Sequence, residues 1–160
     1  MINLLRVDDR LLHGQVAIAW SRNLRLDLIL IANSEAVNDE FTIMTLNLAK
    51  PRNVQIVIED LENTIDLLKS NYFDKNIMIV VKNVEDAYKL SQSIFEIKNL
   101  NLGGIRERRN SVKITPYVSL TQSDFNQLSE MNKYMHVFIQ KIPEDVIIEF
   151  EEVKKCYLSY

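Results

Sequence analysis

Short runs of aliphatic residues constrain the fold of this chain more than any other feature of its sequence. They alternate with segments in which apolar residues recur at helical spacing. A strand that is covered on both faces of a parallel sheet reads as such a continuous run, whereas a half-exposed strand alternates apolar and polar residues. The strands that we expect on this basis are Ile2–Val7, Leu26–Ile31, Val54–Ile58, Ile77–Val81 and Asn99–Leu102.

The segments between these runs have the pattern of amphipathic helices. One apolar stripe runs through residues 61–68 and another through residues 84–91. Asp60, Asn83 and Thr121 are residue types that cap helix N-termini, and an acidic residue follows Thr121 at the third position. Strand and helix therefore alternate with short connections. This order predicts a doubly wound, mostly parallel, open α/β sheet with helices on both faces.

The regular alternation of strands and helices changes towards the C-terminal end. Residues 111–114 and 117–120 have the pattern of short strands, a helix is expected to end near Lys133, and a last strand is expected over Met135–Gln140. The sequence contains no linker, low-complexity segment or internal repeat. We therefore expect residues 1–160 to form a single domain with a sizeable core.

Composition and charge exclude several classes of protein. Hydrophobic residues make up 47% of the chain and charged residues 26%, the balance of a globular protein rather than a disordered one. A net charge of -3 does not suit nucleic-acid binding or an acidic membrane surface. Apolar runs such as Ile77–Val81 are far shorter than the roughly 20 residues that span a bilayer, and Arg6 interrupts the start before a signal-peptide core. With Cys156 as the single cysteine, we expect a cytoplasmic protein that is not inserted in a membrane.

The segment Asp8–Gln15, directly after the first expected strand, is the richest in chemistry. Ligands of such sheets bind outside the carboxyl ends of the strands. His13 can act as a nucleophile near pH 7, and Arg10, with Arg6 nearby, is suited to two-pronged contacts with phosphate oxygens. Gly14 opens the next helix, whose N–H groups and positive end favour an anion. These parts are suited to accepting phosphate.

A carboxylate such as Asp9 is expected either to hold the imidazole in one tautomer or to shape this loop. The residue pattern alone also fits a plainer structure. A histidine after a strand is often a surface or capping residue, and the Asp and Arg side chains of such a turn can form exposed ion pairs of little energetic value. Residue types and spacing leave both alternatives open.

Other chemistries lack the residues that they need. With only Gly14, Gly103 and Gly104, the chain has neither a Walker loop nor a G-x-G-x-x-G fingerprint, and no G-x-S-x-G elbow is present. His13 and His136 are far apart in sequence and one cysteine offers no paired spacing, so we expect neither a metal nor a cofactor. We interpret His136 as structural.

Two features near the expected end of the fifth strand have alternative interpretations. Gly103 and Gly104 allow close packing around the histidine loop, or else form a turn with positive φ. The basic segment Arg106–Arg109, which we place at a hairpin, is either a solvated turn or a patch that meets an acidic face of a partner.

Residues 6–16, with the sequence RVDDRLLHGQV, resemble the signature of the IIB components of the mannose/fructose/sorbose class of the bacterial sugar phosphotransferase system. Weaker matches follow in the same order at residues 81–87, 97–104, 118–121 and 142–143. The resemblance implies the open α/β sheet described above. It also implies that His13 is phosphorylated, on Nδ1, and that Arg10 stabilises the phosphate. We expect Arg6, Asp9, Gly14 and Gln15 to belong to the same phosphate-binding loop. Other IIB classes carry a cysteine at this loop, and here it has none.

The resemblance further implies a relay without a nucleotide. A phosphohistidine of a IIA protein or domain donates to His13, which passes the phosphoryl group to a sugar imported by the IIC/IID membrane components. The chain is then a protein-Nπ-phosphohistidine–sugar phosphotransferase that works beside the transporter, and the membrane components select the sugar. The alternative is a non-catalytic regulatory or assembly module that keeps the fold. Intact Arg10, His13 and Gly14 argue against this alternative.

Overall fold

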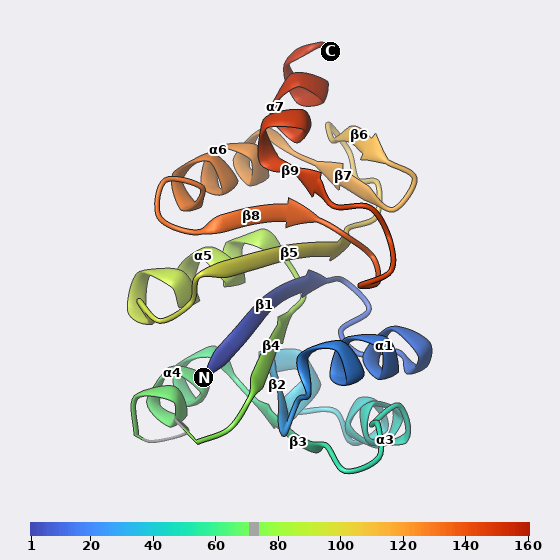
Figure 1. The fold of residues 1–160 in the computed structure, drawn as a ribbon, viewed down its shortest axis with the longest axis vertical. Helices are drawn as coiled ribbons and strands as arrows, with labels where there is room; N and C mark the ends of the chain where they lie inside the picture. Colours follow the sequence, from blue (N-terminus) through green and yellow to red (C-terminus); the bar gives the residue numbers. More distant parts are fainter. Residues whose placement is uncertain (71–73) are drawn as a thin grey trace.

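The structure is a computed structural model that describes residues 1–70 and 74–160. Its main feature is a seven-stranded sheet, shown in Figure 1. The strands of this sheet are β1 (Ile2–Asp8), β2 (Leu28–Ala32), β3 (Gln55–Glu59), β4 (Ile77–Val81), β5 (Asn99–Gly104), β8 (His136–Ile139) and β9 (Ile148–Glu149). Their order is β3-β2-β4-β1-β5-β8-β9, and every neighbouring pair is parallel except β8 and β9. The predicted open, mostly parallel sheet is confirmed.

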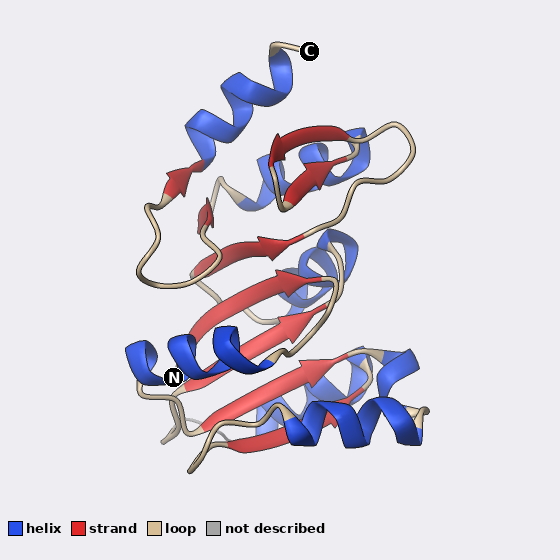
Figure 2. Ribbon diagram, turned by 90° about the vertical axis from the view of Figure 1, so that its right-hand side faces the viewer, coloured by secondary structure: helices blue, strands red, loops and turns tan. Residues whose placement is uncertain are grey.

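Helices cover both faces of this sheet. They are α1 (Gly14–Leu24), α2 (Ser34–Val37), α3 (Glu40–Leu48), α4 (Leu61–Ser70), α5 (Val84–Ser93), α6 (Gln122–Met131) and α7 (Phe150–Leu158). Figure 1 shows α1 and α3 on one side of the strands and α4, α5 and α6 on the other, and Figure 2 looks onto the side that carries α1 and α3. Two separate apolar clusters, one on each face, form the core. This is the doubly wound arrangement that the alternation of strands and helices predicts.

The central strand β1 shows why continuous aliphatic runs mark buried strands. Leu5 and Val7 pack into the cluster beneath α5 and α6, whereas Leu4 packs into the cluster beneath α1. Successive side chains point to opposite faces, and both faces are dry, so both sets of positions are apolar. Polar residues on such a strand therefore need a specific partner.

Capping residues begin three helices where the sequence predicts them. The Asn83 side chain accepts a hydrogen bond from the backbone N–H of Asp86, and Asp60 accepts one from Asn63. Thr121 forms a full capping box at the start of α6. Each cap satisfies an N–H group that the helix itself leaves without a partner.

Two antiparallel strands lie outside the main sheet. They are β6 (Val112–Thr115) and β7 (Val118–Leu120), and a bridge between Ile105 and Val118 joins them to the end of β5. The segment Arg106–Arg109 leads into this hairpin rather than forming its turn. The hairpin places a further wall beside the carboxyl ends of β1 and β5.

Three helices and one short strand were not expected from the sequence: α2, α3, α7 and β9. α7 carries a clear signal, because Phe150, Val153 and Tyr157 are buried at helical spacing and Tyr157 stacks on Phe125 with ring centroids 4.1 Å apart. α3 carries no such signal, since Phe41 lies on its exposed side. Within the described ranges, none of the helices is both long and apolar enough to cross a membrane.

Candidate functional site

A tight turn after β1 presents His13 at the carboxyl edge of the sheet. The backbone N–H of Leu11 donates to the carbonyl of Asp8 at 2.8 Å, and the N–H of Asp9 donates to the carbonyl of Gly104 at 2.9 Å. Leu11 has a φ of 61°, a strained value for a bulky residue. Its side chain is nevertheless buried in the core below α1, which stabilises the turn against this strain. The loop is therefore anchored from both sides.

The imidazole of His13 lies between a carboxylate and a guanidinium group. Its Nε2 atom is 2.9 Å from Oδ2 of Asp8 and 3.2 Å from Nη2 of Arg10. An ionised carboxylate only accepts hydrogen bonds, so Nε2 carries the proton and donates it to Asp8. Arg10 then cannot donate to the same nitrogen and lies against the edge of the ring. The lone pair of the neutral imidazole is left on Nδ1.

Asp8 is ionised although it is fully buried. Burial is the largest single influence on its pKa and opposes ionisation. The hydrogen bond with His13, the charge of Arg6 and the backbone N–H of Arg10 act in the opposite direction. Together they outweigh burial and hold the pKa of Asp8 below its ordinary value. The carboxylate that faces His13 is therefore a permanent negative charge near neutral pH.

Arg6 supplies the counter-charge from beneath the loop. Its side chain is 2% exposed and its Nη2 atom lies 3.0 Å from Oδ2 of Asp8. The other terminal nitrogen donates to the side-chain oxygen of Asn101 at 2.6 Å and to the carbonyl of Gln140 at 3.3 Å. The guanidinium carbon is 5.8 Å from the centre of the Trp20 ring. Burial lowers the pKa of Arg6 and the neighbouring Asp8 raises it.

The residues that the sequence nominates fall into two groups. His13 and Arg10 meet at the surface, and Gly14 and Gln15 lie exposed in the first turn of α1. His13 is the N-cap of this helix without a capping side-chain bond, and the first turn contains no acidic residue. The N–H groups of that turn are thus not capped by a side chain, which favours an anion there. Arg6, by contrast, lies below the surface.

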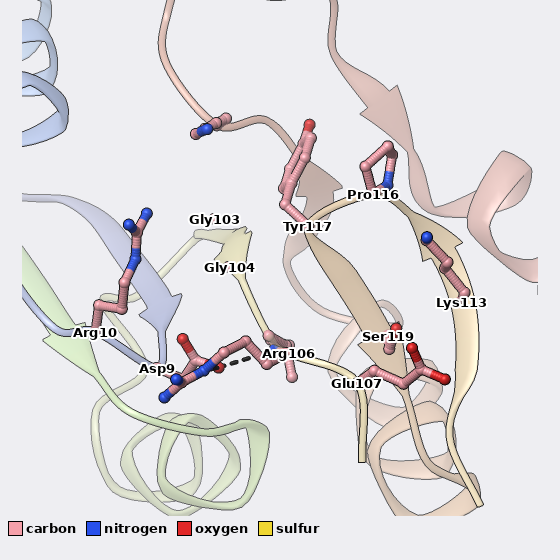
Figure 3. A pocket seen from close by; sticks show the side chains of 12 residues that line it. Asp9, Arg10, Gly103, Gly104, Arg106, Glu107, Lys113, Pro116, Tyr117 and Ser119 are labelled. Carbon is pink, nitrogen blue, oxygen red and sulfur yellow. Dashed lines mark hydrogen bonds and ion pairs between the residues drawn. The ribbon is translucent and has the colours of Figure 1, made fainter.

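The carboxylate that contacts the imidazole is Asp8, not Asp9. Oδ2 of Asp9 instead accepts hydrogen bonds from the backbone N–H of Arg106 at 2.8 Å and from its Nε at 3.1 Å (Figure 3). Of the two functions expected for Asp9, the structure supports the shaping of the loop.

Asp8, Asn101 and Gln140 also belong to this site, although they were not predicted from the sequence. The signal for them is the two-residue alternation of the strands. Arg6 and Asp8 lie on the same face of β1, and Asn101 and Gln140 lie on the matching face of β5 and after β8. These polar residues interrupt the apolar runs of neighbouring strands, near the carboxyl ends of those strands. We call these four residues the buried polar cluster.

Gly103 and Gly104 are close-packing residues, and neither has a positive φ. The interpretation as a turn with positive φ was therefore wrong. A Cβ atom on Gly103 would lie 2.0 Å from the guanidinium carbon of Arg6, and one on Gly104 would lie 3.2 Å from Oδ1 of Asp8. The backbone of β5 approaches the ion pair so closely that a side chain at Gly103 is excluded.

Two residues of the segment Arg106–Arg109 form ion pairs with other parts of the protein. Arg106 pairs with Asp9, and Arg108 pairs with Asp124 at the start of α6. The description of this segment as a solvated turn therefore holds only in part. His136 pairs with Glu149 at 2.6 Å and fastens β9 to β8, a structural contact.

We expect Gly103→Ala to be far more disruptive than the matched variant Gly104→Ala. The new methyl group in the first variant displaces Arg6 and should lower the free energy of unfolding by about 2–3 kcal/mol, whereas the second should cost under about 1 kcal/mol. Urea denaturation followed by the fluorescence of Trp20 measures both. Equal losses for the two variants would contradict the packing described here.

The lowered pKa of Asp8 predicts an acid-labile contribution to stability. Because the folded-state pKa lies below the unfolded value of about 4, this contribution is present above that value and is lost as the pH falls through and below it. Asp8→Asn should lower the free energy of unfolding at pH 7 by about 3 kcal/mol, since Arg6 stays buried without its partner. The deficit relative to wild type should shrink between about pH 5 and pH 2.

The matched control is Asp66→Asn on the exposed side of α4, which should follow the wild-type profile across the same range. A deficit of Asp8→Asn that stays constant with pH would show that the carboxylate is not what stabilises Arg6.

Comparisons with known proteins identify the family of this chain. Residues 2–158 match the family model for the PTS system sorbose subfamily IIB component. A probable phosphotransferase enzyme IIB component of Streptococcus pyogenes is 30% identical over 161 residues, which cover 96% of this chain and 99% of the relative. The sorbose-specific EIIB component of Klebsiella pneumoniae is 31% identical over 133 residues, with coverage of 82% and 81%.

The crystal structure of the IIBSor domain of the sorbose permease from Klebsiella pneumoniae superposes on this structure with a TM-score of 0.89 at 27% identity, covering 97% of each chain. The resemblance of residues 6–16 is thus confirmed at the level of the family. The chain belongs to the sorbose subfamily of PTS IIB components, the phosphocarriers of sugar phosphotransferase systems.

Proposed function

We propose that His13 carries the phosphoryl group of this IIB component and that Nδ1 is the atom that attacks phosphorus. The observation that carries the proposal is the 2.9 Å contact between Nε2 and the ionised Asp8. This contact assigns the proton to Nε2 and leaves a lone pair on Nδ1. His13 is 25% exposed, so an incoming donor can reach the ring while Asp8 holds it from below.

In the first step the phosphoryl group moves from a phosphohistidine of a IIA protein or domain to His13. Nδ1 forms a bond to phosphorus as the donor's N–P bond breaks, and no proton has to move. The ring gains positive charge, which Asp8 stabilises through the Nε2–H hydrogen bond. We propose that Arg10 and the N–H groups of Gly14 and Gln15 bind the equatorial oxygens, where negative charge is spread in the transition state.

In the second step a sugar hydroxyl attacks phosphorus and gives up its proton to water, while the N–P bond breaks and its electrons return to Nδ1. We propose that this step takes place on the IIC/IID membrane components, which import the sugar, with the IIB chain on their cytoplasmic side. The non-catalytic alternative is less favoured. Such a module has no need of a buried, ionised carboxylate aimed at an exposed imidazole, with an arginine beside it.

The experiment that tests the acceptor is labelling by a phosphorylated IIA partner. Wild type should acquire one acid-labile phosphate, and His13→Ala should acquire none, because it lacks the nucleophile. The control is His136→Ala, which removes the other histidine and should label normally. Phosphorus NMR should place the phosphate on Nδ1. Label on His13→Ala, or phosphate on Nε2, would contradict the proposed mechanism.

Arg10→Gln tests the stabilisation of the transferring group. Loss of one charged donor from such a site typically slows transfer by about 100-fold. We expect the single-turnover rate from phosphorylated IIA to fall by about that factor. The matched control is Arg109→Gln, an exposed arginine outside the loop, whose rate should stay near that of wild type. Similar rates for both variants would remove Arg10 from the mechanism.

A further inference from the structure

A hollow lies directly beside the His13 loop, on the side of β5 and β8. It has a volume of about 300 Å³, at the lower end of the range for small-molecule pockets. The turn after β1, the end of β5 and the β6–β7 hairpin contribute to its walls, together with Lys141 after β8. In Figure 3, Arg10 and Lys113 lie on opposite sides of the hollow and Tyr117 lies between them. We call this hollow the hairpin cleft.

The charge of the hairpin cleft is positive. Arg10, Lys113 and Lys141 contribute to its lining, and none of them forms an ion pair with a carboxylate in residues 1–70 or 74–160. Arg106 is neutralised by Asp9, which leaves Glu107 as the unpaired acidic side chain of the lining. Three cations from three separate segments thus face a cleft with one opposing charge.

The cleft also contains an aromatic surface. Tyr117 is half-buried, and Nζ of Lys141 lies 5.9 Å from the centre of its ring. An aromatic face that can pack against a sugar ring therefore lies within reach of cations that can bind a phosphate. Ser119 and Glu107 add polar groups suited to hydroxyls. This combination matches a sugar phosphate better than a bare anion.

Arg10 belongs to both sites. Its Nη2 atom lies 3.2 Å from the His13 ring, and the same side chain lines the cleft. When a phosphoryl group on His13 engages Arg10, the cleft loses one of its three unpaired cations and gains a dianion as a neighbour. Two anions that contact the same guanidinium group lie within a Debye length, about 8–10 Å, of each other, so their repulsion is weakly screened. A phosphoryl group on His13 therefore lowers the affinity of the cleft for an anion, and an anion in the cleft opposes phosphorylation of His13 to the same extent.

We propose that the hairpin cleft binds the phosphate monoester of a sugar, the class of the reaction's product, when His13 is unphosphorylated. The inference rests on the proposed function, because that function makes a sugar phosphate beside this loop. Bound product then slows the next phosphorylation of His13, which gives the carrier a response to product.

The test is an NMR titration of the ¹⁵N-labelled, unphosphorylated chain. Glucose 6-phosphate should shift the amide signals of Lys113, Tyr117 and Lys141 saturably, glucose should not, and inorganic phosphate should bind about tenfold more weakly. The double variant Lys113→Gln/Lys141→Gln should weaken glucose 6-phosphate binding by about tenfold or more. The matched control Lys154→Gln/Lys155→Gln, on the exposed side of α7, should bind as wild type does. Amide spectra away from the cleft verify that each variant is folded.

Equal affinity for inorganic phosphate and glucose 6-phosphate would overturn the recognition of a sugar. Absence of saturable binding would overturn the proposal entirely. If IIA then phosphorylated the Lys113→Gln/Lys141→Gln variant more slowly than wild type, the cleft would be assigned to an acidic partner. Phosphorylated protein should bind glucose 6-phosphate more weakly than unphosphorylated protein, and equal binding would exclude the opposition between the sites. The titration uses no phosphoryl donor, so its failure leaves the labelling of His13 untouched.

Discussion

The buried ion pair between Arg6 and Asp8 is the interaction on which this site depends. Removing two charges from water costs several kcal/mol each, and their attraction offsets this only when the remaining donors and acceptors have partners. Here Asn101 and Gln140 accept from the guanidinium group, and the backbone of Arg10 and the ring of His13 donate to the carboxylate. Within the described part of the chain, no buried side-chain nitrogen or oxygen lacks a hydrogen-bond partner. The network is complete, so the carboxylate is held both ionised and in place.

The sheet and the loop determine where this ion pair lies relative to the ligand-binding edge of the sheet. Arg6 and Asp8 lie on the same face of β1. The charge of Arg6, inside the core, therefore acts on Asp8 at the edge of the sheet where ligands bind. The absence of a side chain at Gly103 makes room for the guanidinium group. The turn at Leu11 then reverses the chain so that His13 returns over Asp8. The buried side chain of Leu11 stabilises this strained turn. The position of the imidazole therefore depends on the packing of the core.

The sequence predicts the sheet well because most of its buried strands are near-continuous aliphatic runs, and it predicts the position of the His13 loop because that loop follows the first run. Only the alternation along β1 distinguishes Asp8 from Asp9, because adjacent carboxylates have the same chemistry and the end of β1 decides which one faces inward. The sequence places Arg6 among the phosphate-binding residues because charge suggests exposure, whereas the structure shows it buried. α3 escapes prediction because its exposed side carries apolar residues such as Phe41, so no polar face marks its period.

A phosphocarrier has to accept a group readily and also release it readily, and the proton on Nε2 serves both demands. In the mechanism that we propose, Nε2 is protonated and hydrogen-bonded to Asp8, and the neutral ring attacks through Nδ1 without first losing a proton. When the group departs, the leaving group is again neutral imidazole rather than its anion, which is a far poorer leaving group. The proton on Nε2 thus stays in place through the whole cycle, and the charge that holds it there is fixed by Arg6 from inside the fold. On this proposal, a single buried ion pair lets one nitrogen act as nucleophile and as leaving group in turn.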